Sequence, residues 1–313
     1  MALTQRTLWS IVYKTCSPLI YHDTGGTSQK VQRVDTLTRI NFQGGWDQVA
    51  LNPAVALKIP QMPAWVYYEV IQGNRYWYVI YQLYHPIDQK YYLPFSMGSH
   101  PQDLEWIMVV YDTQKDQVVA GASVFHAWWY FGARAEAGIL TKNRLAHNVR
   151  PLWIDPTTQR PTFHVQAGGH GIRPYDPNRP RTGRMIYTPN TQVADVPWEV
   201  AWFSAVKPPL KSARYRLERM SEAGGIWSHR NDSGVFRRVN RQARLVMTKN
   251  GGELTASPAT PVWATGDASK LIQVQSGTDI RYLSRLVVDP NGLFREVFSG
   301  IVRDRIISNP FTE

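Results

Sequence analysis

The chain has 313 residues, enough to bury a large core, and its formal net charge is +11. Charged residues make up only 19% of it and aromatic residues 12%, and the 22 glycines and 21 prolines favour short strands and many turns over long helices. The single cysteine, Cys16, excludes an internal disulfide, which fits a reducing compartment or a protein released without disulfide chemistry. We therefore expect a mainly β fold, a sandwich of antiparallel strands with a few short helices and long loops.

Four strands are predicted in the first half of the chain. Residues 64–71 and 75–85 flank Gln72-Gly73-Asn74, a hairpin signal. The second of these strands has aromatic residues on both faces, which is typical of a strand buried on both sides, the alternative being a carbohydrate or lipid-headgroup platform. The third strand, 106–112, and the fourth, 118–126, are separated by so short a link that a second hairpin is expected.

Candidate functional residues lie around the loop that enters the third strand. Asp103 and Glu105 point to the same face, because side chains two residues apart in a strand share a face. Two neighbouring carboxylates are tolerable if both are solvated, if one is protonated, or if a cation lies between them. Folding of the second hairpin places His126 opposite them, while Asp88 and His100 lie at the same rim.

These five residues support two interpretations. Three carboxylates with one or two imidazoles suit a divalent cation, and we expect Mg²⁺, Ca²⁺ or Mn²⁺ rather than Zn²⁺. The alternative is a solvated loop with surface carboxylates, because such residues are common near strand ends.

The motif order resembles two groups of proteins. The pattern Asp88 … His100-x-x-Asp103-x-Glu105 is similar to the centre of the necrosis-inducing (NLP) toxin superfamily. That resemblance implies that these four residues bind the metal, and the family's next strand ends in a histidine where His126 stands here. Within the motif the chain differs from these toxins in having Pro101-Gln102 where the family has Arg-His.

A second resemblance is to the vacuolar-protein-sorting-62-like proteins and uncharacterised bacterial relatives. It covers roughly residues 40–175 and rests on four motifs in the same order: Trp46-Asp47, the segment 81–88, the segment 100–105, and Gly169-His170-Gly171. The glycines beside His170 allow a positive φ, which makes His170 a candidate ligand, proton shuttle or substrate contact. Beyond His126, the aromatic residues Trp128 and Trp129 either cap a core or form a membrane- or sugar-contacting loop.

The last third of the chain has a different character. Residues 207–249 contain eleven Lys and Arg residues and only three acidic residues, which accounts for +8 of the net charge. Residues 210–223 predict a helix, and residues 271–275, 280–288 and 294–302 predict strands, with a turn at 289–292. We expect residues 1–205 to form an NLP-like sandwich, and residues 206–313 to add strands to it or to form a small lobe.

Three functions remain open. The first is a metal-dependent binding protein or toxin-like effector that recognises an anionic or glycosylated membrane surface. The second is a metal-dependent hydrolase with His126 or His170 as acid or base, although no nucleophile elbow or zinc-protease signature supports an enzyme. The third is a structural component of a phage or secretion assembly. The residues expected to contact a surface are Trp128, Trp129, Lys211, Arg214, Arg237 and Arg238.

Partner and location follow from what the sequence lacks. Nucleic acid is disfavoured because no nucleic-acid-binding motif accompanies the basic segment. No run of residues is long and apolar enough for a membrane span. The N-terminus lacks the basic residues followed by an apolar stretch that are typical of a signal peptide. We therefore expect synthesis in the cytoplasm, with release by a non-classical route if the protein acts outside the cell.

Overall fold

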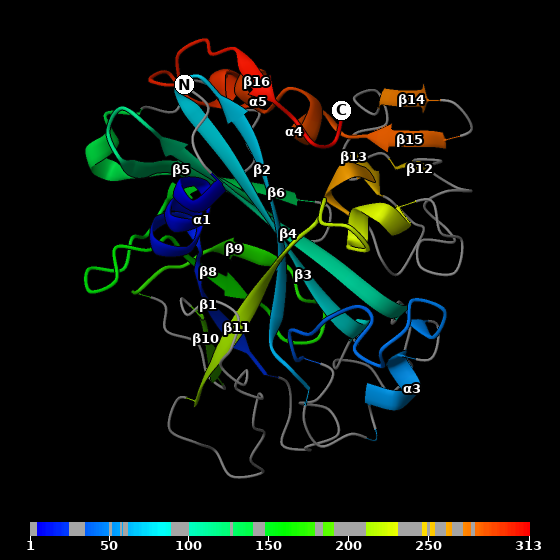
Figure 1. The fold of residues 1–313 in the computed structure, drawn as a ribbon. Helices are drawn as coiled ribbons and strands as arrows, with labels where there is room; N and C mark the ends of the chain where they lie inside the picture. Colours follow the sequence, from blue (N-terminus) through cyan, green and yellow to red (C-terminus); the bar gives the residue numbers. More distant parts are fainter. Residues whose placement is uncertain are drawn as a thin grey trace.

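Strands β3 (Tyr76–Asp88) and β4 (His100–Asp112) are each 13 residues long and cross the middle of the structure (Figure 1). The structure is a computed structural model that describes residues 5–24, 35–49, 52–56, 58, 62–88, 100–125, 128–139, 148–178, 184–190, 211–230, 246–248, 251–253, 261–264, 272–276 and 279–313. It is mainly β with a few short helices, which confirms the predicted fold class.

Twelve strands form one sheet in the order β7-β6-β5-β4-β3-β2-β11-β10-β1-β8-β9, with β16 also paired to β2. Two further hairpins, β12–β13 and β14–β15, stand apart from it. The remaining strands of the large sheet are β1 (Leu19–Asp23), β2 (Trp65–Gly73), β5 (Gln117–Phe125), β6 (Trp128–Ala133), β7 (Asn148–Pro151), β8 (Thr162–Val165), β9 (Ile172–Pro174), β10 (Arg184–Pro189), β11 (Lys211–Arg219) and β16 (Ile306–Ser308). The hairpin strands are β12 (Val246–Thr248), β13 (Gly251–Glu253), β14 (Ile272–Ser276) and β15 (Asp279–Leu283).

The two predicted hairpins are present. β2 pairs antiparallel with β3, and β4 pairs antiparallel with β5. The large sheet is mixed, because antiparallel pairs are joined by four parallel ones, β1–β8, β10–β11, β11–β2 and β6–β7. Parallel neighbours need long connections rather than hairpins, and these pairs join segments far apart in the sequence.

The sheet folds back over itself, which produces a sandwich-like arrangement. Ser123 Oγ of β5 donates a hydrogen bond to the carbonyl oxygen of Ile172 in β9, 2.9 Å away, although the two strands are far apart in the sheet order. The space between the two layers is filled by apolar side chains that we call the strand-side core, among them Ile107 and Val109 of β4 and Phe163 of β8.

A second cluster, the helix-side core, covers the opposite face of β2–β6. Trp106 and Met108 of β4 pack there with Phe294 of α5 and its neighbours. The alternation of β4 residues between the two cores explains why the central strands are apolar on both faces. The helices are α1 (Gln5–Ile11), continued by a π-helical turn (Val12–Cys16), then α3 (Asn52–Ala56), α4 (Arg285–Val288) and α5 (Pro290–Val297), with 3-10 turns at Ala135–Ala137, Ile226–His229 and Val262–Ala264.

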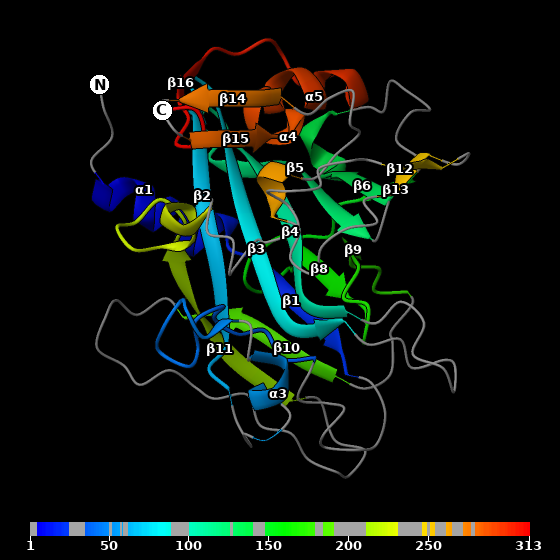
Figure 2. The ribbon, with the colours of Figure 1, turned by 90° about the vertical axis from the view of Figure 1, so that its right-hand side faces the viewer.

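The C-terminal third contributes to both the sheet and the helix-side core. β11 lies between β10 and β2, where a helix over 210–223 had been predicted, so that prediction is wrong. The strand predicted for 294–302 is also wrong, since α5 ends at Val297. α4, α5 and β16 gather at one end of the molecule in both views (Figure 1, Figure 2). Among the described residues, none of the helices has the length and apolar character needed to cross a membrane.

Candidate functional site

The pairing of β3 with β4 brings the acidic motif to one end of these strands. Asp88, the last residue of β3, pairs with His100, the first residue of β4. Further in, His85 pairs with Asp103. Directly opposite residues of an antiparallel pair share a face, and Glu105 shares it as well, being two residues from Asp103. The strands therefore place an imidazole beside two carboxylates.

The three carboxylates of the motif are buried. The exposed fraction is 6% for Asp88 and 7% for both Asp103 and Glu105. Burial, together with the negative charges of Asp103 and Asp88, holds the pKa of Glu105 well above its usual range. Of the three ways to tolerate neighbouring carboxylates, solvation is therefore excluded. A neutral Glu105 or a nearby cation is left.

His170 lies in the loop between β8 and β9 and has a positive φ of 46°. The next residue must be small, because a Cβ atom added at Gly171 would lie 2.8 Å from the ring of Phe125. The Gly-His-Gly sequence thus lets the loop turn tightly against β5 while its histidine enters the protein. The side chain of His170 is completely buried.

Both ring nitrogens of His170 contact carboxylates. Its Nδ1 is 2.9 Å from Oδ2 of Asp103, and its Nε2 is 3.2 Å from Oδ1 of Asp35. The same Asp35 oxygen accepts a hydrogen bond from the backbone N–H of Gly168. Burial lowers the pKa of His170, but the hydrogen bonds to Asp103 and Asp35 outweigh it and raise the pKa to about 9. Near neutral pH the metal-free protein therefore holds an imidazolium cation between two carboxylates.

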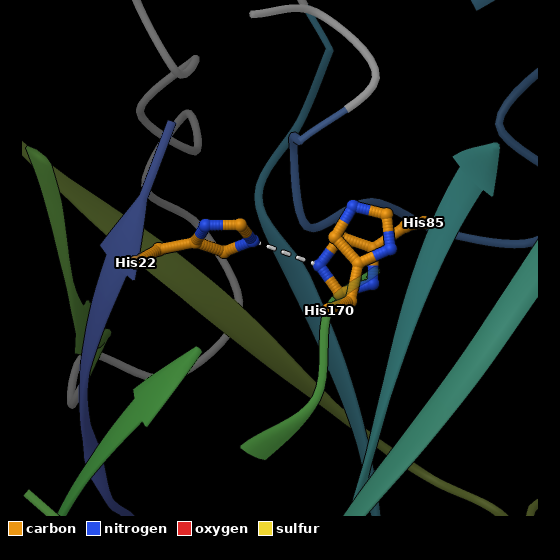
Figure 3. A group of neighbouring side chains, drawn as sticks. All are labelled: His22, His85 and His170. Atoms are coloured by element: carbon orange, nitrogen blue, oxygen red, sulfur yellow. Dashed lines mark hydrogen bonds between the residues drawn. The ribbon is translucent and has the colours of Figure 1, made fainter. Parts of the chain in front are cut away.

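Two further histidines complete a cluster with His170 (Figure 3). The rings of His85 and His170 are stacked, while Nε2 of His22, on β1, is 3.0 Å from Nε2 of His85. One ligand nitrogen from each of the three rings lies within 4.8 Å of the other two. All three side chains are buried. Imidazole nitrogens at such separations can bind one metal ion, so the cluster is a candidate metal site.

His22 and His85 are neutral rings. Burial lowers the pKa of His22 to about 4, although the negative charge of Asp35 opposes this. Burial and the charge on His170 lower the pKa of His85 well below its usual value. Neutral imidazole is the form that binds a metal, and His22 also donates from Nδ1 to the carbonyl oxygen of Asp23, 2.7 Å away.

The sequence-predicted residues divide into three sets. Asp88, Asp103 and Glu105 lie at the same end of β3 and β4, where the charges of Asp103 and Asp88 act on Glu105, and His170 contacts Asp103 directly. Trp129 is partly buried and packs edge-on against Trp106, with ring centroids 5.6 Å apart, and Arg214 is exposed on β11. Only the backbone is described for His100, Trp128 and Lys211, and His126, Arg237 and Arg238 lie outside the described residues.

Sequence reasoning missed His22, His85 and Asp35. The sequence did contain a signal for His85, because this histidine is the last residue of the predicted aromatic strand and lies in the motif segment 81–88. His22 and Asp35 carry no comparable signal. They reach the site only through the fold, in which His22 of β1 contacts His85 and Asp35 contacts His170.

The outer face of β11 is cationic. Arg214 and Arg216 are exposed, while the alternate residues of the strand are buried in the strand-side core. The guanidinium groups of Arg216 and Arg39 lie 5.0 and 4.8 Å from the ring centre of Trp65. The strand thus presents positive charge over an aromatic ring to its surroundings.

Comparison with known proteins gives limited overlap. No family model matches the chain, and no curated protein matches it. Among solved structures, NLPPya in complex with mannosamine is 19% identical, with a TM-score of 0.24 over 35% of this chain and 43% of that chain. Necrosis and ethylene inducing protein 2, from the causal agent of cocoa's witches' broom disease, is 15% identical, with a TM-score of 0.25 over 35% and 44%.

The non-toxic HaNLP3 protein is 15% identical, with a TM-score of 0.28 over 53% of this chain and 65% of that chain. The match spans less than two thirds of each of these three solved chains. At these identities and scores the similarities carry no argument about function, which has to come from the site itself.

Proposed function

We propose that this protein is a metal-dependent binding protein, of the toxin-like effector class, that recognises an anionic or glycosylated membrane surface. Its divalent cation is held by Asp88, His100, Asp103 and Glu105. The observation that supports this is the burial of three carboxylates at one end of β3 and β4, with exposed fractions of 6–7%.

The charges at this end of the sheet favour a cation. Taking carboxylates out of water is costly unless they are neutralised. His170 lies beside Asp103 and Asp35, whereas Glu105 lies near two other acids and has a pKa well above its usual range. A divalent cation bound by the oxygens of Glu105, Asp103 and Asp88 would let Glu105 ionise. Such oxygen-rich sites favour Mg²⁺, Ca²⁺ or Mn²⁺.

The surface supports an anionic partner. Arg214 and Arg216 project from β11, and the segment 207–249 carries most of the net charge. Each basic residue near an anionic membrane contributes about 1 kcal/mol of attraction. In this proposal Lys211, Arg237 and Arg238 extend the same contact, and Trp128 and Trp129 add aromatic contacts at the interface.

Metal binding is tested by titrating chelator-treated protein with Mn²⁺, Mg²⁺ and Ca²⁺ and following heat and melting temperature. The variants are Asp88→Asn and Glu105→Gln, and the matched control is Glu296→Gln, an exposed carboxylate on α5. We expect one ion per chain in the wild type and in the control, and much weaker binding in both site variants. Equal binding by all four proteins would overturn the carboxylate site.

Surface recognition is tested by sedimentation with vesicles of phosphatidylcholine, with and without phosphatidylserine or a mannosamine-bearing lipid. Mannosamine is included because one similar solved structure contains it. We expect binding to the anionic or the glycosylated vesicles that is lost on chelation. Binding to neither would contradict the proposal, and metal-dependent turnover of an ester or phosphodiester would indicate a hydrolase instead.

A further inference from the structure

We propose a second metal site, in which His22, His85 and His170 bind one transition-metal ion of the Zn²⁺ type and Asp35, whose Oδ1 is 3.2 Å from Nε2 of His170, is the candidate for a fourth ligand. The site uses none of the four residues proposed to bind the hard cation. The two sets of ligands are therefore separate, although Asp103 also accepts a hydrogen bond from His170. The histidine site calls for a different metal, because three imidazoles suit Zn²⁺, Cu²⁺ or Ni²⁺ and not Mg²⁺ or Ca²⁺.

The orientation of His22 is fixed by its backbone contact. The carbonyl oxygen of Asp23 can only accept, so Nδ1 of His22 carries the hydrogen and, in the neutral ring, Nε2 carries a lone pair. That lone pair points to Nε2 of His85, 3.0 Å away. Two nitrogens bound to the same tetrahedral Zn²⁺ at its usual bond lengths lie roughly 3.3 Å apart. The two rings are thus already close to the spacing of ligands.

His85 is left with an unsatisfied nitrogen in either tautomer. If Nε2 carries the hydrogen, it donates to His22, and the buried Nδ1 has no hydrogen-bond partner among the described residues. If Nδ1 carries the hydrogen, the lone pairs of the two Nε2 atoms face each other at 3.0 Å. A metal ion resolves the second arrangement, because it accepts both lone pairs.

His170 is oriented by a carboxylate on the nitrogen that would not bind the metal. Asp103 accepts from Nδ1 of His170 at 2.9 Å, an arrangement that fixes the ring and makes Nε2 a better ligand. Asp35 Oδ1 is 3.2 Å from that Nε2. When the metal binds, the proton on Nε2 of His170 leaves to solvent. Asp35 then loses its hydrogen bond to Nε2 and would contact the metal ion instead.

The three ligands come from different parts of the sandwich. His22 is on β1, His85 on β3, and His170 on the β8–β9 loop, and four pairings separate β3 from β1 in the sheet order. An ion in this position would connect the two layers across the edge of the strand-side core. The metal should therefore stabilise the fold as a whole, which distinguishes it from an ion at the surface.

The test is titration of chelator-treated full-length protein with Zn²⁺, and with Co²⁺ as a visible-absorption probe. We expect one ion per chain with the spectrum of tetrahedral Co²⁺, and a higher melting temperature. His22→Gln and His85→Gln keep polar side chains and should weaken binding by about 100-fold or more, since loss of even an outer contact costs 10- to 100-fold. Circular dichroism checks that both variants are folded.

Two controls separate this site from its surroundings. His229→Gln changes a histidine stacked on Trp46 beside the helix-side core and should leave Zn²⁺ affinity unchanged. Glu105→Gln should also keep Zn²⁺ binding, while losing Mn²⁺ binding if the carboxylate site exists, so either site can fail without the other. If both glutamine variants unfold, pulsed electron paramagnetic resonance of Cu²⁺ in the wild type counts the imidazole ligands directly. No Zn²⁺ binding by the wild type, equal loss in the His229 variant, or Cu²⁺ without imidazole ligands would overturn the proposal.

Discussion

The rings of His85 and His170 lie face to face, with centroids 3.6 Å apart and an angle of 4° between their planes. The stack joins a neutral ring to a charged one, because burial and the charge on His170 lower the pKa of His85 while Asp103 and Asp35 raise that of His170. Asp103 pairs with His85 across the strands and contacts His170 at 2.9 Å. Asp103 therefore links the β3–β4 pair to the loop that carries His170.

Asp103 accepts a hydrogen bond from Nδ1 of His170, and its charge helps to hold that ring in the imidazolium form. Asp103→Asn keeps the size of the side chain but removes the charge that stabilises the buried imidazolium. Because Asp35 remains on the other nitrogen, we expect a loss of about 1–3 kcal/mol in the free energy of unfolding. Urea unfolding of the metal-free wild type and variant near neutral pH measures this loss of stability. A change no larger than the error of the method would contradict the role given to Asp103.

Glu105→Gln makes a matched comparison, because Glu105 lies on the same strand and face and is equally buried. Burial and the charges of Asp103 and Asp88 hold the pKa of its carboxyl group well above the usual range, which favours the neutral form in the metal-free protein. We expect this substitution to change the metal-free free energy of unfolding by less than about 1 kcal/mol. A loss as large as that of Asp103→Asn would mean that Glu105 is ionised in the metal-free protein.

The stability of the metal-free protein should depend on the protonation of His170. Its pKa is raised from 6.5 to about 9, so protonation favours the folded state. The resulting stabilisation is complete below pH 6.5, declines as the pH rises towards 9 and is lost above it. We expect the free energy of unfolding to fall over this interval by a few kcal/mol, and His170→Gln to flatten the decline. Parallel curves for the two proteins would refute the assignment.

The cationic face of β11 should contribute to vesicle binding without contributing to folding. Arg214→Glu reverses an exposed charge and so changes the charge of this face by two units. Because each charge contributes about 1 kcal/mol near an anionic membrane, we expect the affinity for anionic vesicles to fall roughly tenfold or more. The melting temperature should not move. Arg295→Glu, at an exposed position on α5, makes the same charge change elsewhere and should have little effect on binding. If both variants lose affinity equally, only net charge matters and β11 is not the contact face.

Helix α5 begins with a capping interaction that can be removed. The side chain of Asp289 accepts a hydrogen bond from the backbone N–H of Gly292, 2.9 Å away, and Pro290 occupies the first turn. Asp289→Ala should reduce the free energy of unfolding by about 1 kcal/mol. Chemical denaturation measures this loss, and an unchanged midpoint and slope would show that the cap contributes nothing.

Local patterns predicted the central strands and their acidic face well. The two-residue period put Asp103 and Glu105 on the face that carries Ile107, and the short links identified both hairpins. The same reasoning failed for β11, whose Lys, Arg and Glu residues are good helix formers. Its true signal was the alternation of Ala213, Tyr215 and Leu217, which are buried in the strand-side core.

Other misassignments have similarly specific causes. The segment Asp289-Pro290-Asn291-Gly292 resembles a turn, but Asp followed by Pro is also the start signal of a helix, and α5 begins there. Asp35 and His170 are 135 residues apart in sequence and meet only because the loop after β8 enters the site. No local pattern specifies such a contact, so the histidine cluster emerged only from the fold.

The most direct test of the metal-dependent account is native mass spectrometry of chelator-treated wild-type protein after addition of Mn²⁺, of Zn²⁺, and of both together. The account predicts one Mn²⁺ per chain, one Zn²⁺ per chain, and both ions together in the mixed sample. It also predicts that Glu105→Gln loses only Mn²⁺ and that His85→Gln loses only Zn²⁺. A wild-type chain that stays at its metal-free mass with every ion would contradict the account and leave the imidazolium of His170 to balance the buried carboxylates.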